Sequence, residues 1–199
     1  MAERERTATL DRTTGETSII VSLTLDGAGD VAVRTGIGMF DHMLHALALH
    51  AGWDLTLTCE GDLNVDDHHS IEDTGLVLGQ ALADAIGPDR ADIVRFGSAY
   101  APLDEALARA VADVSGRPHF SGSLHLKRDR VGSLSCEMVP HFFRSLAQTA
   151  GLTLHIDVIR GVNDHHRIEA SFKALALALR SALATTDDQS DIRSTKGVL

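Results

Sequence analysis

The sequence contains few aromatic residues, only two cysteines and no long hydrophobic run. Phe, Trp and Tyr make up 4% of its 199 residues, so the core must consist mainly of Ala, Leu, Val and Ile. Cys59 and Cys136 form no CxxC motif and no disulfide framework, which fits a protein of the reducing cytoplasm. No apolar stretch approaches the roughly 20 residues of a membrane span, and the charged N-terminal stretch lacks the apolar run of a signal peptide.

Basic residues are also scarce. There are 18 Lys and Arg against 28 Asp and Glu, which gives a formal net charge of −10. This charge argues against a nucleic acid or a membrane as a partner of the whole protein. Basic residues can still gather locally around a small anionic ligand. The hydrophobic content of 44% is that of a globular protein with a sizeable core.

Histidine is abundant, with eleven residues, and the histidines belong to an internal repeat. Residues 39–86 and 138–183 share an order of features: a histidine, an Ala-Gly pair, an alternating apolar stretch and a His-His-x-x-Glu motif. His42 and His141 are 99 residues apart, and the two His-His pairs are 97 residues apart. We interpret the chain as two copies of one half.

The repeat predicts an α+β fold of two tandem halves, residues 1–94 and 95–199, that together form one structural unit. Alternating apolar residues over 53–59, and again in the second copy, predict strands. Each is preceded by a helix that ends at Ala-Gly and is followed by a second helix. Residues 105–116 have a helical composition, but the repeat requires strands there, and we follow the repeat. Each half then reads β-β-β-α-β-α, a small sheet with two helices on one face.

The His-His-x-x-Glu motif predicts a metal site because positions i and i+4 of a helix face the same way. His68 can bind one ion together with Glu72, whereas His69 points about 100° away and must serve a different ion or none. The second copy behaves alike. Asp67 and Asp164, just before the two motifs, stand where helix N-caps are expected.

Two motifs that face each other would form two equivalent sites. Each site takes the i,i+4 pair of one copy, the single histidine of the other copy and one of the histidines matched by the repeat. The predicted ligands of one site are His42, His69, His165 and Glu169, and those of the other are His68, Glu72, His141 and His166.

Three imidazoles and one carboxylate, without a thiolate, suit a borderline divalent ion such as Mn, Fe, Co, Ni or Zn. Open positions remain if the ion is six-coordinate, as a catalytic site requires. Ordinary capping or surface roles are the alternative for adjacent histidines. The other histidines, His45, His119, His125 and His155, lack support from the repeat and are expected to be structural or exposed.

Several stretches are similar to motifs of the imidazoleglycerol-phosphate dehydratase family: "GIGMFDHML", "DDHHSIEDTG", "NDHHRIEASFKA" and "STKGVL". The resemblance covers the chain from about residue 4 to 199. It implies halves of the ribosomal protein S5 domain 2-like type. It also implies a cytoplasmic hydro-lyase of histidine biosynthesis that converts D-erythro-imidazole-glycerol phosphate to imidazole-acetol phosphate and water. Members of the family bind two Mn²⁺ ions and assemble as homo-oligomeric shells of 24 subunits, with metals between subunits.

The resemblance also assigns residues beyond the metal ligands. Glu16, in "GETSI", matches a glutamate that acts in acid/base proton transfer. Residues at positions that contact the substrate are Glu16, His42, His50, Arg95, Arg117, Ser194 and Lys196. His45 stands where many relatives carry a different residue, which affects local substrate contacts and leaves every predicted ligand in place.

We hypothesise that a metal-stabilised imidazolate of the substrate helps the C3 hydroxyl to leave, while Glu16 manages the C2 proton. Arg95 and Arg117, with the C-terminal tail, would hold the phosphate, although either arginine could be an ordinary surface residue. The alternative function is a non-enzymatic protein whose metal ions hold an oligomer together. It explains the His/Glu sites equally well but not Glu16 or the basic residues.

Overall fold

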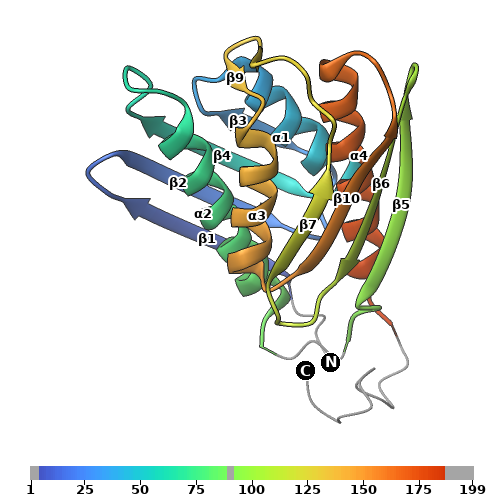
Figure 1. Ribbon diagram of the computed structural model, residues 1–199. Helices are drawn as coiled ribbons and strands as arrows, with labels where there is room; N and C mark the ends of the chain where they lie inside the picture. The colour runs from blue at the N-terminus through green and yellow to red at the C-terminus, as the bar shows by residue number, and fades with distance from the viewer. Residues whose placement is uncertain (1–4, 89–91, 187–199) are drawn as a thin grey trace.

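The chain folds into two similar halves, of which the computed structural model describes residues 5–88 and 92–186 (Figure 1). The first half has the predicted order β-β-β-α-β-α. Its elements are β1 (Thr7–Thr13), β2 (Thr17–Thr24), β3 (Val31–Arg34), α1 (Gly38–Ala51), β4 (Asp54–Gly61) and α2 (His68–Ile86). The strands form one sheet in the order β1-β2-β4-β3, antiparallel except where β3 runs parallel to β4.

The second half repeats this topology, with sheet order β5-β6-β10-β7. Its elements are β5 (Phe96–Leu103), β6 (Ala106–Asp113), β7 (His119–Ser123), β8 (Arg130–Val131), β9 (Leu134–Ser135), α3 (Met138–Ala150), β10 (Thr153–Arg160) and α4 (Asp164–Ala182). The two-half α+β prediction is therefore confirmed. The small β8–β9 hairpin has no counterpart in the first half of the described chain, and the repeat did not predict it.

The four helices lie between the two sheets (Figure 1). Helices α1 and α2 cover the first sheet and α3 and α4 the second, and across the middle α1 packs on α4 and α2 packs on α3. The scarce aromatic residues concentrate here. The rings of Phe142, Phe143 and Phe172 have centroids between 4.8 and 5.7 Å apart. The helix layer is therefore the shared core of both halves.

Two glycines allow α2 to approach α3 closely. A Cβ atom at Gly79 would lie 2.2 Å from the Thr149 hydroxyl oxygen and 2.5 Å from the Leu146 carbonyl oxygen. One turn earlier, a Cβ atom at Gly75 would lie 2.9 Å from Ser145 Cβ. Only glycine fits at such a crossing. The pair therefore sets the distance between the middle of α2 and the C-terminal half of α3.

The conflict over residues 105–116 is resolved in favour of a strand, because β6 spans Ala106–Asp113. Its inward positions are alanines, which the composition alone assigned to a helix. Small residues are needed because α4 lies directly on this sheet. On the neighbouring strand, a Cβ atom at Gly97 would lie 1.9 Å from the Ala178 carbonyl oxygen. The alanines therefore reflect close helix–sheet packing and not helix propensity.

The predicted N-cap position is found at α2 but not at α4, and in both helices the capping side chain lies one residue earlier than predicted. Asp66 accepts a hydrogen bond from the His68 backbone N–H at 2.8 Å, and Asn163 accepts one from the His165 N–H at 2.9 Å. Asp67 makes no side-chain cap on α2. Asp67 therefore occupies the predicted N-cap position of α2 without capping the helix through its side chain, whereas Asp164 is the first residue of α4, so its predicted N-cap position is wrong.

Asp67 and Asp164 instead anchor the segment between β7 and α3. The Asp67 carboxylate accepts hydrogen bonds from the Ser135 backbone N–H at 2.6 Å and from its hydroxyl at 2.7 Å. The Asp164 carboxylate accepts two backbone N–H bonds, from Lys127 at 2.9 Å and Arg128 at 2.8 Å. Both carboxylates are buried. This segment is thus fixed to the starts of both metal-motif helices.

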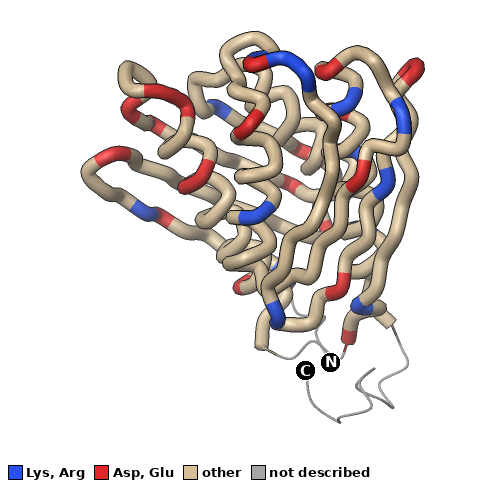
Figure 2. The backbone as a smooth tube through the Cα atoms, viewed as in Figure 1, with Lys and Arg blue, Asp and Glu red and all other residues tan. Residues whose placement is uncertain are grey.

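Acidic and basic residues are interspersed along the described chain, with no continuous basic face in the view of Figure 2. None of the described helices is long and apolar enough to cross a membrane.

Candidate metal centres and their surroundings

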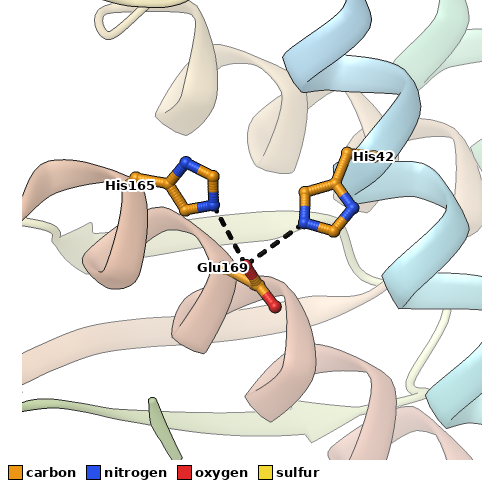
Figure 3. A group of neighbouring side chains, drawn as sticks. All are labelled: His42, His165 and Glu169. Atoms are coloured by element: carbon orange, nitrogen blue, oxygen red, sulfur yellow. Dashed lines mark hydrogen bonds and ion pairs between the residues drawn. The ribbon is translucent and has the colours of Figure 1, made fainter. Parts of the chain in front are cut away.

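Two groups of histidine and glutamate side chains converge in the described part of the chain. In the first, Glu169 Oε2 lies 3.2 Å from Nε2 of His42 and 3.2 Å from Nε2 of His165 (Figure 3). The three donor atoms lie within 4.8 Å of one another. His42 comes from α1, whereas His165 and Glu169 lie one turn apart on α4. This group contains three of the four ligands predicted for one site.

The second group repeats the first on the other pair of helices. Glu72 Oε2 lies 3.0 Å from His68 Nε2 and 3.1 Å from His141 Nε2. His68 and Glu72 lie one turn apart on α2, and His141 lies on α3. Each group thus spans the contact between the two halves, which is why neither half alone can form one.

The donor set of each group fits a divalent ion. Two imidazole nitrogens and a carboxylate oxygen converge on one region, a ligand combination that suits borderline divalent metals. The groups also remain open on one side, since the side chains of His42 and His68 are 49% and 45% exposed. Further ligands or a substrate can therefore approach each group from outside the chain.

Glu169 carries an additional contact that Glu72 lacks in the described structure. Lys173, one turn further along α4, places Nζ 2.6 Å from Glu169 Oε1. Burial alone would raise the pKa of Glu169, but the hydrogen bonds from Lys173 and His42 hold this pKa below its ordinary value. Glu169 is therefore ionised and available as a ligand. The i,i+4 spacing of Lys173 was a signal that sequence reasoning missed.

His69 and His166, the predicted fourth ligands, lie outside both groups within one chain. His69 places Nδ1 3.0 Å from Asp62 and Nε2 3.5 Å from Glu16. Its pKa is raised chiefly by the hydrogen bond to Asp62. The structure therefore separates the single histidine from the i,i+4 pair, as the helix geometry predicted, but does not place it beside the other copy's pair.

His166 has a similar environment in the second half. Its Nδ1 lies 2.7 Å from Glu105 and its Nε2 lies 3.8 Å from Asp104. Hydrogen bonds from the Asn163 backbone N–H, from His166 and from the Val162 backbone N–H lower the pKa of Glu105 to about 2. The hydrogen bond to Glu105 in turn raises the pKa of His166. No sequence pattern pointed to these carboxylates, because Glu105 and His166 are distant in the chain.

Glu16, the predicted acid/base residue, lies in the turn between β1 and β2. Its backbone N–H donates to the Thr14 hydroxyl at 3.2 Å, and its carbonyl oxygen accepts from the Asp62 N–H at 3.1 Å. The next residue, Thr17, donates its hydroxyl to Asp73 of α2 at 2.5 Å. The turn is thus held on both sides while the Glu16 side chain remains 55% exposed.

The predicted phosphate-binding arginines converge on one carboxylate. The buried Arg95 pairs with Asp113 through Nε at 2.7 Å and Nη2 at 3.2 Å, and Arg117 approaches the same carboxylate at 3.8 Å. Arg117 is 67% exposed and can turn toward a ligand. The other two predicted substrate-binding residues of this set, Ser194 and Lys196, lie outside the described residues.

Arg95 and the His42–His165–Glu169 group lie at opposite ends of α4. The Arg95 backbone N–H donates to the carbonyl of Ala182, the last residue of α4, whereas Glu169 lies in its second turn. The intervening helix is about 20 Å long at 1.5 Å per residue. His50, in the last turn of α1, has a pKa lowered by burial and by the nearby Lys173. His50 therefore lies on the Glu169 side and not on the arginine side.

The chain is similar to proteins of one known family. A family model described as imidazoleglycerol-phosphate dehydratase matches residues 35–179. The chain is 54% identical to the imidazoleglycerol-phosphate dehydratase of Phaffia rhodozyma, over 98% of this chain and 96% of that protein. It is 53% identical to the enzyme of that name from Salinibacter ruber, with the same coverage of 98% and 96%.

Solved structures give the same result. The crystal structure of the Pyrococcus furiosus protein, in complex with (S)-C348, matches with a TM-score of 0.83 and 36% identity, over 96% of this chain and 100% of that one. The Staphylococcus aureus imidazoleglycerol-phosphate dehydratase matches with a TM-score of 0.79 and 42% identity, over 90% and 99%. The chain therefore belongs to the imidazoleglycerol-phosphate dehydratase family, the hydro-lyases of histidine biosynthesis.

Proposed function

We propose that this protein removes water from D-erythro-imidazole-glycerol phosphate to give imidazole-acetol phosphate, in the cytoplasm and with two Mn²⁺ ions in each active site. The observation that carries the proposal is the pair of equivalent His/His/Glu groups on α1–α4 and α2–α3. Duplicated ligand groups are what an enzyme with two bound ions requires. Family membership supplies the reaction.

The proposed ligands are the three residues of each group and one further histidine for each ion. His42, His165 and Glu169 hold one ion together with His69 of another subunit, and His68, Glu72 and His141 hold the second together with His166 of another subunit. The exposed outer sides of both groups support a contribution from a neighbouring chain. When bound, the ions supply Lewis acidity toward the nitrogen atoms of the imidazole ring.

Glu16 is the proposed acid/base group for the C2 proton. Three features support this role: its turn is fixed by hydrogen bonds, its carboxylate is exposed, and that carboxylate faces Nε2 of His69 at 3.5 Å. If His69 is a metal ligand, Glu16 lies beside the ion and within reach of a substrate bound there. A fixed backbone with a free carboxylate suits a residue that must take up and return a proton.

The phosphate is proposed to bind to Arg95 and Arg117, with Ser194 and Lys196 of the tail. Both arginines contact the Asp113 carboxylate, which brings two guanidinium groups together where a phosphate could bind. Because about 20 Å of α4 separates Arg95 from the His42–His165–Glu169 group of the same chain, a small substrate bound at that group needs the arginines of another subunit. This supports a homo-oligomer, with the family's shell of 24 subunits as the expected assembly.

The test is turnover by the intact protein. Mn-loaded protein incubated with imidazole-glycerol phosphate should yield a product that has lost one water, detected by mass spectrometry. A non-enzymatic metal-stapled oligomer remains the alternative. It would show assembly that depends on Mn²⁺ without any loss of water from the substrate, and that result with every divalent ion tried would contradict the proposal.

A further inference from the structure

The two single histidines, His69 and His166, have matching environments that are built from non-equivalent residues. Each has a carboxylate at Nδ1: Asp62 at 3.0 Å in the first half and Glu105 at 2.7 Å in the second. Asp62 directly follows β4, whereas Glu105 lies in the turn before β6. The carboxylate at Nδ1 therefore comes from different parts of the fold in the two halves. Duplication of one half would have placed it at equivalent positions, so duplication alone does not explain the match.

The repeat-equivalent of Glu105 is Glu16. Each glutamate occupies the hairpin turn immediately before the second strand of its sheet. Their side chains are used differently. Glu105 is fully engaged: Oε2 binds His166, and Oε1 accepts the backbone N–H groups of Val162 and Asn163 at 2.9 and 2.8 Å. Among the described residues, the Glu16 carboxylate makes only its 3.5 Å approach to His69.

The repeat-equivalent of Asp62 is Gly161, the residue that directly follows β10. A Cβ atom at Gly161 would lie 3.0 Å from Arg167 Cγ and 3.0 Å from Ala106 Cβ, and its φ of 147° disfavours a side chain. The second half therefore has no room for a carboxylate where the first half has Asp62. Glu105 fills the resulting gap at His166.

We infer that Asp62 and Glu105 are positioning residues that orient the imidazoles of His69 and His166 as Nε2 ligands, and that Asp62 thereby leaves Glu16 free for proton transfer. A carboxylate at Nδ1 holds the proton on that nitrogen and leaves the Nε2 lone pair for a metal. Ligand orientation of this kind is worth about 10- to 100-fold in metal affinity. The inference rests on the proposed function, since it assumes that both histidines are metal ligands.

The decisive comparison is between the two equivalent glutamates in the assembled protein. Glu105→Gln keeps an oxygen for Val162 and Asn163 but removes the charge at His166, so Mn²⁺ affinity should fall about 10- to 100-fold. Glu16→Gln should retain the Mn²⁺ affinity of the unmodified protein and lose turnover by about 10²- to 10⁴-fold.

Mn²⁺ affinity is measured by chelator competition, with the metal quantified by mass spectrometry. Glu60→Gln, an exposed strand glutamate, is the matched control and should bind Mn²⁺ normally.

A double-mutant cycle separates positioning from general stability. If Glu105 acts through His166, then Glu105→Gln should cause no further loss of Mn²⁺ affinity in a His166→Ala background. Asp62→Ala with His69→Ala gives the same test in the first half, and serves if a Glu105 variant does not fold. Additive losses in either cycle, or unchanged affinity in the single variants, would overturn the inference. A parent protein that binds Mn²⁺ without turnover would refute the proposed function and the proton-transfer role of Glu16 but not the positioning roles of Asp62 and Glu105, whereas one that binds none would refute both proposals.

Discussion

Lys173 shows at the scale of single residues that the two metal groups are not chemically equivalent. It places its ammonium 2.6 Å from Glu169, whereas the corresponding position beside Glu72 is Leu76. Glu169 is also the more buried of the two carboxylates, at 11% against 37% side-chain exposure. An ion at the Glu169 group would therefore have a neighbouring cation and less contact with water. The repeat keeps the ligands and varies what surrounds them.

Asp54 provides a pH-dependent prediction that is independent of the metal groups. Its Oδ1 accepts three successive backbone N–H bonds, from Ala28, Gly29 and Asp30, at 2.8 to 2.9 Å. The Asp30 bond in particular, with those of Ala28 and Gly29, lowers the pKa of Asp54 below its ordinary 3.8. A lowered pKa means that the ionised carboxylate stabilises the folded state above pH 3.8, and that this contribution is lost as the pH falls through the folded-state pKa.

Asp54→Asn should therefore be less stable than the parent protein at neutral pH, and the difference should shrink at about pH 3. Chemical denaturation at the two pH values measures it. Asp11→Asn, at an exposed position on β1, is the control and should show little difference at either pH. A stability difference for Asp54→Asn that stays constant with pH would contradict the role given to its carboxylate.

At the scale of elements, the close crossing of α2 and α3 makes Gly79 a sensitive position. Replacing an interior helix glycine with alanine ordinarily stabilises a helix by about 1 kcal/mol. Here the new methyl would lie 2.5 Å from the Leu146 carbonyl oxygen, which belongs to a rigid helix backbone. Overpacking of this kind costs about 1–3 kcal/mol, so Gly79→Ala should be destabilised overall.

The same change should also weaken Mn²⁺ binding, because separating α2 from α3 moves Glu72 away from His141. The control is Gly38→Ala at the start of α1, where an added Cβ meets nothing within 4 Å. Urea denaturation and Mn²⁺ titration of the two variants measure both effects. A Gly79→Ala protein as stable as the Gly38→Ala protein would show that the crossing is looser than described.

The elements also show what the sequence could and could not predict. The duplicated motifs were sufficient for the order of strands and helices and for β6, where the repeat overruled the helical composition of Ala106–Asp113. They also predicted that His42 and His141 would meet the i,i+4 pairs. Asp67 was correctly placed at the N-cap position of α2, but the N-cap of α4 was misplaced by one residue, because several acidic and amide side chains compete at each helix start. Asp62 and Glu105 could not be found, since periodicity reports which face a residue occupies but not which distant loop it meets.

At the scale of the whole molecule, the groups proposed for the active site lie in different parts of one chain. The metal groups lie at the starts of the motif helices, and Arg95 is bonded to the far end of α4. The boundary between the halves at residue 94 stays a prediction from the sequence. It does not separate two independent bodies, because the helices of both halves share one core. Among the residues that the structure describes, a single chain does not bring Arg95 together with the His42–His165–Glu169 group.

An active site shared between subunits makes a quantitative prediction for mixed assemblies. Glu16→Gln and Arg117→Ala should each be inactive, because one removes the acid/base group and the other part of the phosphate site. If the two groups come from different chains, an equal mixture that reassembles at random should contain roughly a quarter of sites with both residues intact. About that fraction of the parent activity should return after chelation, mixing and addition of Mn²⁺.

Mixing Glu16→Gln with a chain that carries both substitutions is the control and should restore nothing. Native mass spectrometry confirms that the variants share assemblies, and in that case a mixture without activity would mean that each active site draws Glu16 and Arg117 from the same chain.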